Sequence, residues 1–362
     1  MKTGVQGAYF RLYNACFPVK GAAMGLICDV QRKELLHIPS LLAEVLEKIY
    51  QYSVEEIKDV YDHQYDKGID AYLAKLVELG VGFYTHNPEA FPAVELSWGS
   101  PLEVYAAVIE VESVSNYDVG DVIRQLDDLG CAGLQVRFLE PFSVEDICRM
   151  LQPAKDSRLK FIELYIRENG ELEEQLFRIV KENRRVTTLV VHSAGEPRIV
   201  FPEKNAGSVN IVYTGQPVRR GQPDMARLEN FVASTPILAE ARHFNIALNR
   251  KVCIDAEGFI RNYVSHEAHF GHVSQASIRA AVESPAFREK WRLHNDLIEQ
   301  CRDCQYRYLC LSNSDVVENG GKYHKKEICD FDPYTNTWHK QTLRDQLRGD
   351  AQNPALAGDK RE

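Results

Sequence analysis

Four cysteines near the carboxyl end of the chain have the type and spacing of metal ligands. Three of them lie in the run CRDCQYRYLC, and the full pattern is Cys301-x2-Cys304-x5-Cys310-x18-Cys329. Two intervening residues let neighbouring thiolates reach one centre from a tight turn, and four thiolates suit either tetrahedral zinc or a 4Fe-4S cluster. Four soft anionic ligands are tolerable together only around a cationic centre. The spacing therefore predicts a four-thiolate site, with iron–sulfur and zinc both open.

The composition bounds the setting of this site. The net charge of −9 over 362 residues disfavours nucleic acid and anionic membranes as partners, because counterion-driven binding needs a basic surface. No apolar run approaches the roughly 18 residues of a transmembrane helix, and Lys20 interrupts the apolar stretch near the N-terminus, so no signal peptide is expected. We expect a cytoplasmic protein, in which clustered cysteines indicate metal or catalysis and not disulfides. The scattered cysteines are expected to be small buried side chains: Cys16, Cys28, Cys131 and Cys148.

A second group of potential ligands is the run HEAHFGH, which places His266, His269 and His272 three residues apart. On a helix these histidines would share one face. The run is one residue short of the zinc-protease motif HExxH, and its Phe-Gly step favours a loop. We expect solvated loop histidines, with His266 and His269 kept as weaker candidates for metal binding.

The elements that must position these residues fall into four parts. Residues 1–90 contain short β-prone runs and then helical runs, which suits a winged-helix-like module followed by a Pro- and Ser-rich linker. Residues 100–250 alternate between β-prone and amphipathic helical runs, which predicts a parallel sheet covered by helices, either open and doubly wound or an incomplete barrel. Residues 251–340 begin with a hairpin, continue as a helix broken at Pro285 and hold the four cysteines. Residues 341–362 are polar and are expected to be disordered.

Three finer expectations concern single segments. The run DMARLENFVASTPILAEAR (224–242) is predicted to be one helix, and FNIALNR (244–250) a further strand of the sheet. The run GLICDV (25–30) is either an edge strand, to which a peptide adds by β-augmentation, or a strand buried in its own fold.

Polar residues at the carboxyl ends of the predicted strands mark where a pocket of this sheet would lie. They are Glu110, Glu112, Glu140, His192 and Tyr213. Glu112 and His192 have side chains suited to proton transfer, and Glu140 is a further weak candidate. A polar cavity without catalysis is the alternative. The chain has no GxGxxG run and no phosphate-binding loop.

The run CRDCQYRYLC, with Cys329 after it and VCIDAEGFIRN before it, resembles the SPASM domain of radical SAM peptide maturases. The order of the predicted parts resembles the SPASM-domain peptide maturase of grasp-with-spasm systems. This resemblance implies an α/β fold: a degenerate partial (β/α)6 barrel of radical SAM type, an N-terminal winged-helix-like module and a C-terminal Cys-rich SPASM domain. In the family pattern, the four cysteines match the ligands of the second auxiliary 4Fe-4S cluster.

Two departures from the family pattern limit what the resemblance implies. The C-x3-C-x2-C motif that holds the cluster for S-adenosylmethionine cleavage is absent, because ESVSNYDVG follows the first barrel strand, and FLEP (138–141) replaces the glycine-rich turn after the second. We therefore expect no S-adenosylmethionine chemistry. Ser314 stands where the family has a further cysteine, and only Cys253 remains of the first auxiliary ligand set. One 4Fe-4S cluster is expected, not two.

The resemblance implies a function in the maturation of ribosomally made peptides (RiPPs). The chain would bind a precursor peptide through residues 1–90 and act with an ATP-grasp ligase, as a recognition subunit more than as a radical enzyme. Two alternatives stay open. One is an active maturase that uses a non-radical or redox step in the barrel, and the other is a zinc-stabilised binding protein.

Overall fold

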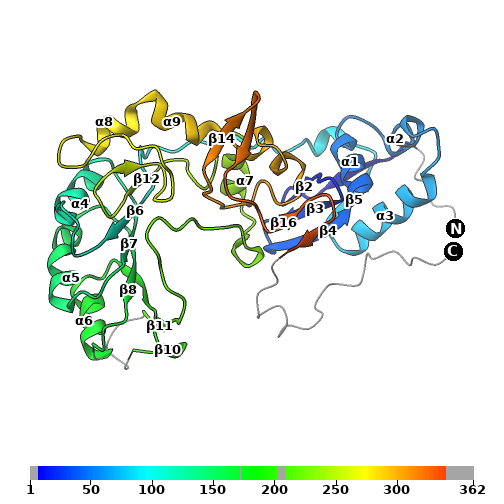
Figure 1. Ribbon diagram of the computed structural model, residues 1–362. Coiled ribbons are helices and arrows are strands. Elements are labelled where there is room, and N and C mark those ends of the chain that lie inside the picture. The colour runs from blue at the N-terminus through cyan, green and yellow to red at the C-terminus, as the bar shows by residue number, and fades with distance from the viewer. Residues whose placement is uncertain (1–6, 172, 203–208, 340–362) are drawn as a thin grey trace.

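The computed structural model describes residues 7–171, 173–202 and 209–339. These residues form a mixed α/β fold with a large sheet at one end, a small N-terminal sheet at the other, and the cysteine-containing segment between them (Figure 1). No helix in the described ranges is long and apolar enough to cross a membrane. The predicted tail, residues 341–362, lies outside the described residues.

The N-terminal part consists of five short strands and three helices. Strands β2, β3 and β4 form an antiparallel sheet in that order, and β1 pairs with β5. The elements are β1 (Tyr9–Leu12), β2 (Cys16–Val19), β3 (Met24–Asp29), β4 (Glu34–Pro39), α1 (Ser40–Lys48), α2 (Val54–Val60), α3 (Asp66–Glu78) and β5 (Gly82–Thr85).

Local sequence explains where these helices begin and end. Ser53 and Glu56 form a reciprocal capping box at the start of α2. Gly80 adopts a positive φ of 65° just after α3, a conformation that favours glycine. The apolar faces of the helices meet the strands in one core, with Phe10, Ile27 and Leu46 almost fully buried.

The large sheet has eight strands in the order β10-β11-β9-β8-β7-β6-β12-β13. The inner six are parallel, and an antiparallel strand flanks them at each edge. The strands are β6 (Ala106–Val111), β7 (Gly133–Phe138), β8 (Phe161–Arg167), β9 (Val186–His192), β10 (Arg198–Val200), β11 (Ile211–Tyr213), β12 (Lys251–Ile254) and β13 (Ile260–Arg261). Strand β12, the last parallel strand along the chain, pairs with β6, the first.

One face of this sheet packs against helices, and we call the opposite one the inner face. Along β8, Ile162 and Leu164 are buried in the core, whereas Glu163 and Tyr165, which alternate with them, are only half-buried. Figure 1 shows α4 (Val119–Asp128), α5 (Val144–Met150) and α6 (Glu173–Glu182) along one side of the strands. The prediction of a parallel sheet covered by helices is confirmed at this level.

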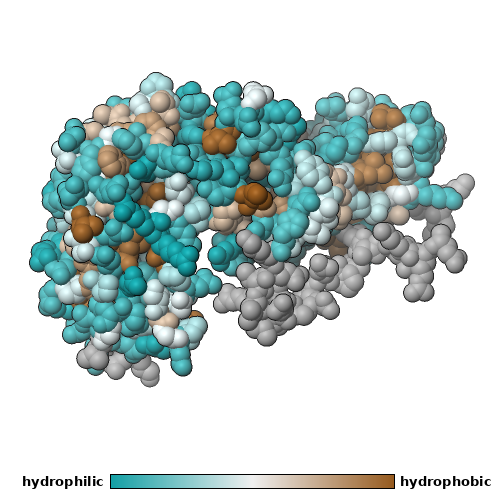
Figure 2. Space-filling view, viewed as in Figure 1, coloured by the Kyte–Doolittle hydropathy of each residue, from teal (hydrophilic) through white to brown (hydrophobic). Residues whose placement is uncertain are grey.

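The segment after the sheet carries the cysteines. Helices α8 (Ile278–Glu283) and α9 (Pro285–Arg292) meet at Ser284 and Pro285, as the proline predicted. Two short hairpins follow: β14 (Val316–Asn319) with β15 (Lys322–Lys325), and β16 (Phe331–Asp332) with β17 (Thr337–Trp338). In the view of Figure 2 most of the surface is hydrophilic, and the apolar surface lies in small separate groups.

Two expectations for single segments were wrong, each for a local reason, and the structure decides between the two alternatives for a third segment. Helix α7 covers only Thr235–Ala241, because Pro236 belongs in a first helical turn and Ser234 caps it. Residues 244–250 form turns and not a strand, since the Asn245 and Asn249 side chains bond within the turn and to neighbouring segments. Strand β3 overlaps the run GLICDV at residues 25–29 and is a central strand, because β2 and β4 pair with its two sides. Of the two alternatives for this run, the strand buried in its own fold is confirmed.

Candidate metal centre and inner-face cavity

The four cysteines of the predicted site come from two loop segments. Cys301 begins a 3-10 turn (Cys301–Asp303), Cys304 and Cys310 bracket the loop after it, and Cys329 lies just before β16. All four thiols are free of disulfide bonds and are partly buried. Three of them, Cys304, Cys310 and Cys329, pack against one apolar cluster that also contains Tyr306 and Phe331.

The electrostatics of these thiols show that they influence one another. The pKa of Cys301 is raised to about 12, mainly by burial; Cys310 and Cys329 also contribute to this rise, whereas Lys325 opposes it. Burial also raises the pKa of Cys304, with further contributions from the other three thiols. The pKa values of Cys310 and Cys329 are raised by burial as well. All four side chains are therefore neutral thiols near neutral pH until a cation favours the thiolate.

The donor chemistry of this group fits a thiolate-ligated metal centre. As they lie in the described ranges, however, these four cysteines do not form a group that could hold a metal ion, and neither does any other set of three or more His, Cys, Asp or Glu side chains there. Cys253 is fully buried in β12, where its sulfur faces the backbone oxygen of Asn262, and its electrostatic neighbours are Arg137, Glu110 and Lys251. None of the four cysteines is among these neighbours, whereas the four act electrostatically on one another.

Tyr306, in the middle of the cysteine loop, joins this loop to the N-terminal sheet. Its hydroxyl lies 2.5 Å from Nε2 of His37 on β4, and its ring packs 5.0 Å from the ring of Phe331 and 5.1 Å from that of Phe231. The backbone N–H of Tyr306 also points to the sulfur of Cys304 at 3.4 Å. One residue therefore contacts a candidate ligand and the sheet of residues 1–90.

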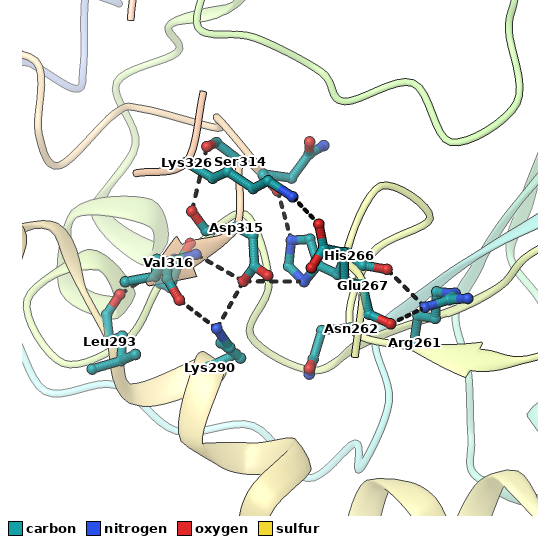
Figure 3. Close-up of polar contacts among 12 residues, drawn as sticks. Arg261, Asn262, His266, Glu267, Lys290, Leu293, Ser314, Asp315, Val316 and Lys326 are labelled. Carbon is teal, nitrogen blue, oxygen red and sulfur yellow. Dashed lines mark hydrogen bonds and ion pairs between the residues drawn. The ribbon is translucent and has the colours of Figure 1, made fainter. Parts of the chain in front are cut away.

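His266 is buried and not solvated, contrary to the expectation for the HEAHFGH run. Its exposed fraction is 3%, Nε2 lies 2.9 Å from the backbone oxygen of Asn313, and Nδ1 lies 3.7 Å from Asp315. Asp315 also accepts from Lys290 at 2.8 Å and from the backbone N–H of Val316, as Figure 3 shows. Burial lowers the pKa of His266, although Asp315 raises it. This network fastens the histidine segment to the residues that follow Cys310.

The other two histidines of the run lie elsewhere. The rings of His269 and His272 both pack on Phe259, at 4.5 and 5.4 Å between centroids. Nε2 of His272 lies within hydrogen-bond distance of Asn116 and of the backbone oxygen of Glu257. Their rings are held by local packing at the hairpin of β12 and β13.

The three candidates for proton transfer lie at the carboxyl edge of the sheet. His192 is fully buried, with Nε2 3.0 Å from the backbone oxygen of Phe138, and burial lowers its pKa. Glu112 faces Arg220 at 3.6 Å, and Glu140 accepts a hydrogen bond from the backbone N–H of Ser113. None of the three lines the main cavity of the described residues.

That cavity has a volume of about 750 Å³ and lies on the inner face of the sheet. Its polar lining includes residues that the sequence reasoning did not single out: Gln135, Arg137, Glu163, Tyr165 and Lys251. A usable signal was present in the sequence, because polar residues recur at every second position of β7 and β8. A central parallel strand covered on both faces would be almost continuously apolar.

A segment that we call the strap, residues 214–231, covers part of this cavity and is fixed by buried charges. Both carboxylate oxygens of Glu110 lie 3.1 Å from the backbone N–H of Gly221. Arg137, at 5% exposure, bonds to Asp224 at 3.2 Å and to the hydroxyl of Tyr263 at 2.7 Å. Burial raises the pKa of Glu110 to about 7, although the Gly221 N–H and Arg137 lower it.

Comparisons with known proteins give a limited result. No protein-family profile matches the sequence, and no curated protein sequence matches it. Two similar solved structures are those of SuiB from Streptococcus suis. SuiB bound to S-adenosylmethionine has a TM-score of 0.38 and 10% identity, covering 83% of this chain and 94% of that one. SuiB bound to precursor peptide SuiA has a TM-score of 0.39 and 11% identity, covering 89% and 100%. Scores this low establish no shared function.

Proposed function

We propose that this chain is a maturation protein for ribosomally made peptides, which binds a precursor peptide and acts with an ATP-grasp ligase. In this proposal residues 1–90 recognise the peptide, residues 100–250 form a degenerate partial barrel, and residues 251–340 hold one 4Fe-4S cluster. The observation that carries the proposal is the group of four mutually interacting thiols in the SPASM-like spacing.

The cluster ligands in this proposal are Cys301, Cys304, Cys310 and Cys329. A cubane distributes its four thiolates over four irons, a wider arrangement than the single tetrahedral ion of a zinc site requires. When bound, such a cluster supplies one-electron transfer or orders the surrounding loops. Ser314 is fully buried, and its hydroxyl accepts from the backbone N–H of Glu327, two residues before Cys329. A hydroxyl that ties the two ligand loops together is consistent with a single closed cluster.

The proposal does not include cleavage of S-adenosylmethionine. The sequence after β6 has no cysteine before Cys131. At the carboxyl end of that strand, the Glu110 carboxylate accepts hydrogen bonds from the backbone N–H of Gly221 in the strap. The missing cysteines support a recognition subunit more than a radical enzyme.

Peptide recognition is assigned to the free edge of β4. Within the described sheet, β3 is paired on both sides and β2 contains Pro18, which has no N–H to donate. Strand β4 is therefore the edge with a complete set of main-chain donors up to Ile38. An extended peptide adding there would form main-chain hydrogen bonds, with specificity from side-chain pockets.

Two measurements test this proposal. Iron and acid-labile sulfide are determined after anaerobic purification; a colourless protein with stoichiometric zinc would overturn the cluster assignment and favour the zinc-stabilised alternative. Binding of precursor peptides encoded beside the gene is measured for the full chain and for Leu35→Pro and Leu36→Pro. Neighbouring N–H groups of a strand alternate in direction, so one proline removes a donor to the peptide and the other a bond within the sheet. Equal peptide binding by wild type and both folded variants would refute the β4 assignment.

An active maturase remains the second candidate because of one observation. Glu110 is a buried carboxyl with a pKa of about 7 beside Arg137, and such groups are frequent at catalytic sites. Modification of the precursor by the ligase with wild-type chain, with Glu110→Gln or without the chain separates the two candidates. A recognition subunit predicts equal product with wild type and the variant.

A further inference from the structure

Among the charged side chains that line the inner-face cavity, two of opposite sign do not neutralise each other. Lys251 lies at the start of β12, and Glu163 lies on β8. Strand registers place Lys251 beside Ala106, Gly133 and Phe161, and Glu163 in the next row of the same face, beside Gln135 and Val108. Both line the cavity of about 750 Å³.

The ammonium of Lys251 has no ion-pair partner among the described residues. The carboxylates that act on it electrostatically, Glu240 and Asp224, are engaged elsewhere, by Asn249 and by Arg137. Burial lowers the pKa of Lys251, since the cavity wall withdraws it from bulk water. A half-buried cation without a counterion is costly, and an anion entering the cavity would offset that cost.

Glu163 presents the complementary feature. Its carboxylate accepts one hydrogen bond, from Gln135 at 2.9 Å, and forms no ion pair with a described lysine, arginine or histidine. Between the two charges the inner face of the sheet carries little side-chain bulk, because Ala106 has a small side chain and Gly133 has none. A Cβ on Gly133 would lie 2.1 Å from the ring of Phe161, which covers this position. The cavity therefore offers an apolar ring and a smooth floor between a cation and an anion.

The spacing of the two charges sets the size of a ligand that reaches both. Their backbones are three strand-to-strand steps apart, from β12 to β6, β7 and β8, and two residues apart along the strands, which gives about 16 Å at roughly 4.8 Å per step and 3.3 Å per residue. An extended chain advances about 3.3 Å per residue, and both side chains reach inward from their strands, so about four to five residues span this distance.

We propose that the inner-face cavity binds a short extended peptide with free ends, its carboxylate pairing with Lys251 and its ammonium with Glu163. The site is separate from the β4 edge and from the four cysteines, and it does not depend on the function proposed above. Arg227 and Asn230 of the strap also line the cavity and offer further donors.

The test uses tetra-alanine with free ends, its C-terminal amide and its N-acetyl form, titrated calorimetrically into the full chain. A charge-assisted pair contributes about 1.5–3 kcal/mol, so removing either terminal charge should weaken binding to wild type by about tenfold or more. Lys251→Gln should bind the free acid and the amide equally, whereas Lys251→Arg should keep the preference. Glu163→Gln should lose only the preference for the free amine. Lys160→Gln, an exposed lysine beside β8, is the matched control and should behave as wild type.

Two outcomes would overturn the proposal. One is wild-type protein that binds all three peptides equally or none of them, and the other is folded Lys251→Gln protein that keeps its preference for the free acid. Thermal unfolding of each variant checks the fold. Peptide binding at β4 and iron content are measured on the same samples, so failure of the cavity site is distinguishable from failure of the proposed function.

Discussion

Tyr306 provides the sharpest test of how the cysteine loop is held against the N-terminal sheet. Its side chain is 4% exposed and packs among the rings of Phe231, Phe331 and Trp338, and its hydroxyl meets His37. Truncation to alanine removes a buried ring, which costs about 3–5 kcal/mol of unfolding free energy. Tyr306→Phe keeps the ring and leaves His37 Nε2 without its partner, which costs about 1–3 kcal/mol.

The assay is urea unfolding followed by circular dichroism, with limited proteolysis of the segment 91–105 as a second readout. Tyr334→Phe is the control, because that tyrosine is 56% exposed although its hydroxyl bonds to Asp303 at 2.7 Å. Surface substitutions of this kind change stability by about 0.5 kcal/mol or less. The order Tyr306→Ala, Tyr306→Phe, Tyr334→Phe in decreasing cost is expected. If Tyr306→Ala costs no more than Tyr334→Phe, the loop is not anchored through this ring.

Three further predictions concern the core, a buried charge and the thiols. Gly25→Ala should lower the unfolding free energy by about 1–3 kcal/mol, because the added Cβ would lie 2.4 Å from the Cβ of Ala43 on α1. Gly68→Ala should raise it by about 0.5–1 kcal/mol, because a Cβ at this position of α3 meets no atom within 4 Å. In the folded state the pKa of Glu110 is raised from 4.5 to about 7, so the folded state binds more protons than the unfolded state in this range. The unfolding free energy of the wild type should therefore fall by roughly 3 kcal/mol between about pH 5 and 8. In urea titrations Glu110→Gln should lack this pH dependence of the unfolding free energy, and an unchanged pH dependence would contradict the prediction. Burial raises the pKa of all four cysteines of the candidate site, so each thiol must release a proton to bind a metal. The affinity for cobalt(II), measured by thiolate-to-metal absorption, should rise by about tenfold per pH unit for each proton released. An affinity that does not depend on pH would refute thiol ligation.

The sequence predicted the local elements of the β/α part well, because they depend on short-range patterns. The strands and helices between Ala106 and His192 follow apolar periodicity, and the break between α8 and α9 follows from Pro285. The errors occurred where side chains override periodicity. The side chains of Asn245 and Asn249 hold a β-prone run in turns. Pro236 lies in the first turn of α7, so the helix forms only in the last part of the predicted segment.

The candidate sites divide in the same way. The spacing of the four cysteines and the missing C-x3-C-x2-C motif are properties of the sequence alone, since they require only neighbours along the chain. The inner-face cavity was not predicted, because its lining comes from β6, β7, β8, β12 and the strap, which meet only after folding. Glu112, Glu140 and His192 were chosen by their place at strand ends, which fixes the edge but not the direction of a side chain.

What the sequence by itself determined is therefore the inventory: alternating strands and helices, a hairpin before the cysteines, and a four-thiolate spacing. Only the tertiary structure decided which strands are neighbours. It placed β12 beside β6, made β3 a central strand and set Tyr306 against His37. The physical reason is that these contacts join segments far apart in sequence, and their free energy depends on the burial of a shared core that no local pattern specifies.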